Sequence, residues 1–344
     1  MDLLLRLSAF LASLRVTQSK IVRAVEALHI PPSSNLEFHD RRAVRVCAVQ
    51  YELKNYSSLQ EYVSDINGYI EKAVKTGAQM VVFPEGMSFS SLSLIPFYSK
   101  IEARLKGTQD KAEVLETLSE IFVDYLYEIY STLFSHLALS HRIYIVAGST
   151  YLYEDDTLRN RAHLFGPAGG ELAVQDKLFP SGDELSIGMT GGEHIEVTET
   201  NLGHLAMMVG QDDEYYEPFK IASLSGADLI ALTASCKGKK DPFRAVGAVA
   251  ARAYEYNVFC IRSTMVGRFV TGEKLSDQAG VYGPYPCAKE EHGVIACAPN
   301  DTEGCIVAAR LDFQKLENTL DNYNSYSNDA ISAQYGELFQ DYVK

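Results

Sequence analysis

Two segments of this sequence end apolar runs with charged side chains that could do acid–base chemistry. The run 81–83 leads through Pro84 to Glu85, and the segment 175–180 carries Lys177, with Glu184 seven residues further on. A carboxylate can serve as a general base, and later as an acid, when partial burial raises its pKa. A nearby lysine can stabilise the oxyanion of a tetrahedral intermediate. Together these residue types favour cleavage of an amide or nitrile bond.

A third apolar run, residues 204–209, ends at Gly210, which has no side chain. Covalent cleavage of an amide needs a nucleophile, and cysteine suits that role because its thiolate is accessible near neutral pH. Taken singly, Glu85 is equally compatible with a solvated loop carboxylate, and Lys177 with an exposed lysine. The interpretation therefore depends on the order of the three segments.

This order resembles the nitrilase superfamily of carbon–nitrogen hydrolases, whose triad is Glu, Lys and a cysteine nucleophile, usually with a second Glu. Glu85, Lys177 and Glu184 match that pattern, and Gly210 stands at the position of the cysteine. The resemblance implies that the backbone N–H of Gln211 binds the substrate oxyanion. It implies no metal and no organic cofactor.

The segment after Gly210 carries the most specific part of the resemblance. The family continues Cys-Tyr-Asp-x-x-Phe-Pro-Glu and later has a Gly-Ala-Asp strand, which Asp212, Glu217 and residues 226–228 match. Gln211 and Tyr216 depart from it, since they replace an aromatic residue and a proline.

Later segments extend the likeness over residues 44–312. Residues 251–257 resemble the Arg-Ala-x-Glu-Asn helix of the family, and residues 264–267 and 280–282 resemble a bacterial branch sometimes fused to acetyltransferases.

Two functions are compatible with these residues. In the first, the protein is an amidase-type hydrolase that acts on a C–N bond of a small amide, with the nucleophile lost at Gly210. In the second, it is a natural non-catalytic relative that binds a carboxamide-like ligand or scaffolds a partner. Cys236 ends a later strand and could stand in for the missing thiol, as could a water activated by Glu85 or Glu184, and a purely structural protein is the third option.

The composition restricts the partners. A net charge of -14, from 31 basic and 45 acidic residues, argues against nucleic acid and anionic membranes, which require a basic face. The six cysteines lack CxxC spacing, and a chain of 344 residues can build a core without disulfides, so a reducing cytoplasm fits best. We expect a small amide-like substrate or ligand as the partner, and a homodimer or higher homo-oligomer that light scattering can detect.

The periodicity of the chain predicts an α/β fold. Strand-like runs at 44–50 and 79–83 flank an amphipathic helix at 59–76, which is a βαβ unit. Further strands are expected at 142–148, 204–209, 227–233 and 258–263, with a hairpin around the turn 166–170; helices are expected at 110–140, 217–225 and 242–256.

The resemblance implies a four-layer α-β-β-α sandwich of the nitrilase type. We divide the chain into an N-terminal helical extension at 1–35, a carbon–nitrogen hydrolase domain at 44–312 and a C-terminal arm at 313–344, extended from residue 318.

Overall fold

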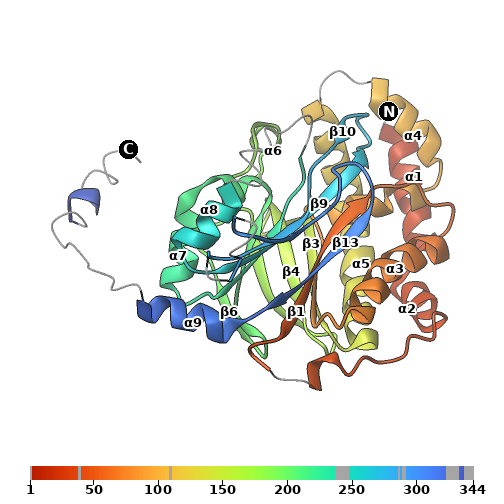
Figure 1. Ribbon diagram of the computed structural model, residues 1–344. Coiled ribbons are helices and arrows are strands. Elements are labelled where there is room, and N and C mark those ends of the chain that lie inside the picture. The colour runs from red at the N-terminus through yellow and green to blue at the C-terminus, as the bar shows by residue number, and fades with distance from the viewer. Residues whose placement is uncertain are drawn as a thin grey trace.

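A computed structural model describes residues 2–37, 40–107, 111–236, 248–285, 287–288, 292–322 and 333–336 (Figure 1). The strands of the central path lie in the order β5-β4-β3-β2-β1-β9-β8-β7-β6. Their bounds are β1 Val44–Glu52, β2 Met80–Val82, β3 Tyr144–Glu154, β4 Thr157–Phe165, β5 Glu171–Asp176, β6 Val197–Thr200, β7 Gly203–Val209, β8 Leu229–Thr233 and β9 Phe259–Arg268.

Strand β9 joins two halves of this path. Its residues 259–263 pair in parallel with β8, whereas its residues 264–266 pair in parallel with β1. Side chains from β1 and β2 and side chains from β7 and β8 meet in one buried cluster, so the two halves face each other as two packed sheets. The remaining strands lie at their edges: β10 Lys274–Leu275, β11 Gly280–Tyr282, β12 Val294–Cys297 and β13 Cys305–Leu311.

Helices cover the outer face of each sheet (Figure 1). On one side lie α1 Asp2–Arg15, α2 Gln18–Glu26, α3 Leu59–Lys75, η2 Met87–Leu94, α4 Tyr98–Gly107 and α5 Lys111–His141. On the other side lie α7 Tyr216–Leu224 and α8 Ala248–Glu255. Each helical layer has its own hydrophobic cluster against its sheet, which together with the cluster between the sheets gives the four layers α-β-β-α.

Strand β1 shows why the sequence folds into these layers. Val44, Val46 and Ala48 belong to the cluster between the sheets, whereas Cys47 and Val49 belong to the cluster under the helices. Because alternate side chains of a strand point to opposite faces, a strand buried on both faces is almost continuously apolar. This is the pattern that the sequence has at 44–50.

The expected secondary structure is largely confirmed. Helix α3 starts at Ser58, whose side chain accepts a hydrogen bond from the backbone N–H of Glu61, and Gly77 follows its end with a φ of 88°. The N-terminal extension forms α1 and α2, both of which contact α5. The hairpin around 166–170 joins β4 to β5. Part of the helix expected at 242–256 lies outside the described residues.

One expectation was wrong. Residues 318–322, which we expected to be extended, lie in helix α9 Phe313–Asn322. The helix is anchored by Phe313 and Leu316, which are buried in the cluster between the sheets. The polar character of the following residues concealed this anchor.

Among the described residues, none of the helices combines the length and apolar character that a membrane span requires.

Candidate functional site

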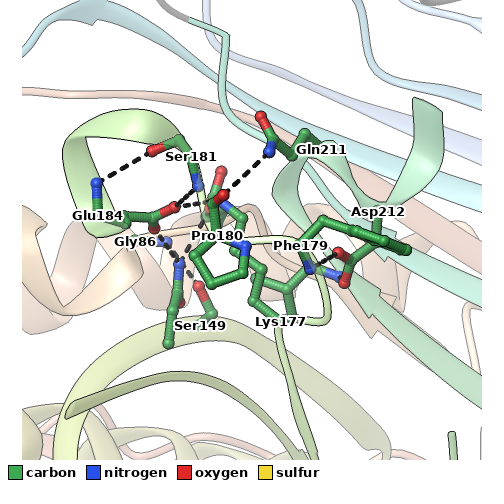
Figure 2. Close-up of polar contacts among 12 residues, drawn as sticks. Gly86, Ser149, Lys177, Phe179, Pro180, Ser181, Glu184, Gln211 and Asp212 are labelled. Carbon is green, nitrogen blue, oxygen red and sulfur yellow. Dashed lines mark hydrogen bonds and ion pairs between the residues drawn. The ribbon is translucent and has the colours of Figure 1, made fainter. Parts of the chain in front are cut away.

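The ends of three strands converge on one cavity. Glu85 follows β2, Lys177 follows β5 and Gly210 follows β7. Ligand sites in open α/β sheets commonly lie at the carboxyl ends of strands, where backbone and side chains leave the sheet together. The turn after Glu85 is held by Gly86, which has a φ of 73° and donates its N–H to the Ser149 hydroxyl at 3.0 Å (Figure 2).

The ammonium group of Lys177 lies between two carboxylates. Its Nζ is 2.8 Å from Oε1 of Glu85 and 2.7 Å from Oε2 of Glu184. The side chains are 5%, 12% and 4% exposed for Lys177, Glu85 and Glu184, so the cluster is shielded from bulk water. The structure thus brings together the three charged residues that we selected from the sequence.

The electrostatics of this cluster favour the charged forms of Lys177 and Glu184. Burial alone would lower the pKa of Lys177, but the charges of Glu85 and Glu184 raise it above its ordinary value. Burial alone would raise the pKa of Glu184, but the charge and hydrogen bond of Lys177 lower it instead.

Glu184 is held by neighbours on both oxygens. Its Oε1 accepts from the Tyr151 hydroxyl and from Asn160 Nδ2, both at 3.0 Å. Its Oε2 accepts from the backbone N–H of Ser181 at 2.7 Å. The backbone N–H of Glu184 donates in return to the Ser181 hydroxyl, and the two bonds form a capping box. Asn160 also donates to Oε1 of Glu85 at 3.0 Å, so this amide orients both carboxylates.

Gly210 stands where β7 turns into the short 3-10 helix η3 Gly210–Glu214. Its φ of +61° lies in the left-handed region, and a Cβ at this position would lie 2.5 Å from Oε1 of Glu85. The backbone thus turns sharply at Gly210, and the Glu85 carboxylate lies where a Cβ of residue 210 would be.

Asp212 ties the turn of Gly210 to the segment that carries Lys177. Its carboxylate accepts from the backbone N–H of Phe179 at 2.9 Å, of Val209 at 3.0 Å and of Leu178 at 3.1 Å; Figure 2 shows the bond to Phe179. Burial raises the pKa of Asp212 to about 7, against the opposing effect of these donors. Gln211 reaches the same segment through its side-chain amide, which donates to the Pro180 carbonyl at 3.3 Å (Figure 2).

The cavity at this cluster has a volume of about 290 Å³. Glu85, Lys177, Glu184, Asn160, Tyr151 and Gln211 line its polar side, and Phe89, Leu115, Met265, Phe269 and Leu275 line its apolar side. Cys236 also lines the cavity, so the alternative thiol that we considered is close enough to meet a ligand there.

A second ion cluster lies under the same turn. The guanidinium of Arg262 donates to Asp213 and to Asp277, both at 2.7 Å, and to the Gln278 carbonyl at 3.2 Å. The side chains are 0% exposed for Arg262, 3% for Asp213 and 4% for Asp277.

Sequence reasoning missed several residues of these two clusters. Asn160, Tyr151 and Arg262 lie within strands and carry no motif. A polar residue inside an otherwise buried strand is the signal that could have found them, because such a group needs a partner.

The fold and the site define a class: four-layer α/β proteins with two carboxylates and a lysine gathered beside a sharp turn at the end of a strand. The chain matches the sequence profile of the family described as "Carbon-nitrogen hydrolase" over residues 45–320, and it belongs to that family.

One curated relative, described as a hydrolase, agrees with this assignment. "Probable hydrolase YhcX" from Bacillus subtilis (strain 168) is 24% identical over 298 residues, which cover 86% of this chain and 55% of that protein. The chain thus spans about half the length of this curated relative.

Solved structures of an amidase from Nesterenkonia sp. have the same fold. One has a TM-score of 0.60 and 18% identity, and the match covers 81% of this chain and 94% of that one. A mutant of the amidase from Nesterenkonia sp. AN1 in complex with butyramide has a TM-score of 0.59 and 18% identity, covering 83% and 98%.

Proposed function

We propose that this protein binds a small carboxamide in the cavity beside Gly210 and holds it without forming a covalent intermediate. The observation that carries the proposal is the cluster of Lys177 with Glu85 and Glu184 at a turn that has no nucleophilic side chain. The cavity thus offers the types of polar group that amide cleavage uses, whereas residue 210 supplies no attacking atom. Loss of a covalent nucleophile typically costs many orders of magnitude in rate.

The donors and acceptors of the cavity match those of a primary amide. The ammonium of Lys177 has three N–H groups, of which two donate to Glu85 and Glu184. The third can donate to a ligand carbonyl, assisted by the backbone N–H of Gln211. The NH₂ group of the ligand can donate to Glu85, and its alkyl part can contact Phe89 and Phe269 on the apolar side.

A structural relative supports binding without a thiol. A mutant of the amidase from Nesterenkonia sp. AN1, in which alanine replaces a cysteine, is described in complex with butyramide. Butyramide is small enough to serve as the first probe for a cavity of about 290 Å³.

The direct experiment is a titration of the protein with butyramide and with butyrate, followed by ligand-observed NMR. We expect saturable binding of butyramide and at least tenfold weaker binding of butyrate, because a third carboxylate would lie against Glu85 and Glu184. Lys177→Met should abolish amide binding. Lys75→Met, a lysine on α3 whose side chain is 77% exposed, is the matched control and should bind butyramide normally. Equal binding of the amide and the acid, or binding that survives Lys177→Met, would rule the proposal out.

Amide hydrolysis is the second candidate function, favoured by the charged cluster that the site retains. Burying three charges costs stability even where they are paired, so a cluster with no chemical role has little reason to be retained. The test is Gly210→Cys, followed by alkylation with iodoacetamide and by release of ammonia from butyramide. We expect the new thiol to be alkylated within the peptide that contains residue 210 and to support measurable turnover. A thiol at position 210 that is inert in both assays would exclude hydrolysis through residue 210, while the butyramide titration tests binding separately.

A further inference from the structure

A second hollow, of about 190 Å³, adjoins the cavity beside Gly210 and shares two aromatic residues with it. Phe89 and Phe269 line both spaces, and their rings meet edge to face with centroids 5.5 Å apart. The hollow is built from the loop after β1, from η2 and α4, and from the end of β9. A ligand in this hollow would bind whether or not the first cavity binds a carboxamide.

The charged groups of this hollow are mainly basic. Lys54, Lys106 and Arg268 line it together with one carboxylate, Glu102. Lys106 pairs with Glu102 at 3.0 Å, and Lys54 pairs with Asp65 at 3.1 Å. Two of the three cations therefore have a carboxylate partner.

Arg268 is the cation in excess. Its Nη1 donates to the Gly272 carbonyl at 3.1 Å, and among the residues that the structure describes no ion pair joins its guanidinium to a carboxylate. A guanidinium has five N–H donors in a planar fork, so a single carbonyl leaves most of them for a ligand. A local excess of positive charge stands out in a chain with a net charge of -14.

Neutral donors complete the hollow. The Ser93 hydroxyl lines it and accepts from the backbone N–H of Tyr56 at 2.8 Å, which leaves its own hydrogen to donate. The Asn55 side chain lines the same space and carries an NH₂ group. Charged and neutral donors around one small space are the usual surroundings of a bound oxyanion.

We propose that this hollow binds a small oxyanion of the phosphate type, with Arg268 as its main ligand and Lys106 and Lys54 as supporting charges. The anion would neutralise the excess charge that Arg268 contributes. Glu102 is the one group of the lining that opposes it.

The test is a titration of the full chain with inorganic phosphate at constant ionic strength, followed by calorimetry. We expect saturable binding of one equivalent. Arg268→Gln should weaken binding at least tenfold, whereas Glu102→Gln should tighten it, because the variant removes the opposing carboxylate.

Arg45→Gln is the matched control. Arg45 is likewise an exposed arginine on a strand whose Nη1 donates to one backbone carbonyl, that of Thr76 at 3.3 Å, but it lies outside the hollow. Circular dichroism and the unfolding midpoint of each variant exclude misfolding. Heat changes that never saturate, an equal loss in Arg45→Gln and Arg268→Gln, or an unchanged affinity in Glu102→Gln would overturn the proposal.

Discussion

Among the residues that the structure describes, two buried clusters each place one cation between two carboxylates. In the first, Lys177 contacts Glu85 and Glu184, and in the second, Arg262 contacts Asp213 and Asp277. Each cluster has a formal charge of -1, and its nitrogen–oxygen distances are 2.7 to 2.8 Å. Contact geometry alone does not distinguish a ligand site from a structural cluster.

The two clusters differ in whether they adjoin a cavity. All three residues of the lysine cluster line a cavity of about 290 Å³, whereas none of the three residues of the arginine cluster lines it. The third N–H of the ammonium can therefore reach a ligand, whereas the N–H groups that Arg262 does not use for its two carboxylates and its carbonyl adjoin no part of this cavity. A buried ion cluster therefore indicates a function only where it adjoins space for a ligand.

The turn η3 links the two clusters. Gly210 faces the lysine cluster, Asp212 binds the backbone of the segment that carries Lys177, and Asp213 belongs to the arginine cluster. Burial of the arginine cluster thus anchors the turn that shapes the site.

The largest expected effect is on stability, from Arg262→Met. It leaves two buried carboxylates without their cation, which typically costs about 3–5 kcal/mol. Urea denaturation measures this loss. The triple variant Arg262→Met, Asp213→Asn, Asp277→Asn should recover most of it, since neutral groups are cheaper to bury. A loss below about 1 kcal/mol for Arg262→Met would mean that the cluster is not structural.

The second largest effect is the change in the free energy of unfolding with pH that Asp212 causes. Its pKa is about 7 in the folded protein and about 3.9 in an unfolded chain. Between these values the folded state holds a proton that the unfolded state has released, so stability falls as pH rises. Relative to Asp212→Asn, the wild type should lose roughly 2 kcal/mol between pH 5 and pH 7. Urea denaturation at several pH values tests this, and a pH-independent difference would show that Asp212 stays ionised.

Lys177→Met should destabilise the protein less than Arg262→Met does. The carboxylates that it leaves adjoin a cavity that water can enter, so we expect a loss of about 1–3 kcal/mol. The comparison uses the same urea denaturation. Equal losses in the two variants would mean that the cavity does not hydrate Glu85 and Glu184.

The smallest effect is expected for Gly210→Ala. A methyl group at a φ of +61° costs about 1 kcal/mol, and the flexible end of Glu85 must move to admit it. Gly68, inside α3, has no neighbour within 4 Å of an added Cβ, so Gly68→Ala should stabilise the protein by about 0.5–1 kcal/mol. Thermal unfolding of both variants should show a lower midpoint for Gly210→Ala and a higher midpoint for Gly68→Ala. A higher midpoint for Gly210→Ala would contradict the role of this turn.

Local sequence patterns predicted the strands that precede Glu85 and Gly210, and the hairpin whose second strand precedes Lys177. The first two strands are buried on both faces and are apolar along most of their length, whereas β5 is partly exposed. The order of these residues also predicted which side chains would meet, because the resemblance supplied a known topology. The helix at 318–322 was missed because two apolar anchors carry little weight among polar neighbours.

The polar contacts that orient the charged residues of the site could not be predicted from the sequence. Asn160 lies 75 residues from Glu85, and Arg262 lies 49 residues from Asp213. Periodicity encodes which face of an element is buried, but it holds no information on which distant polar group will lie opposite. Packing of the two sheets decides which polar partners meet. It also decides the shape of the cavity and of the adjoining hollow, because it fixes distances between residues that are far apart in the sequence.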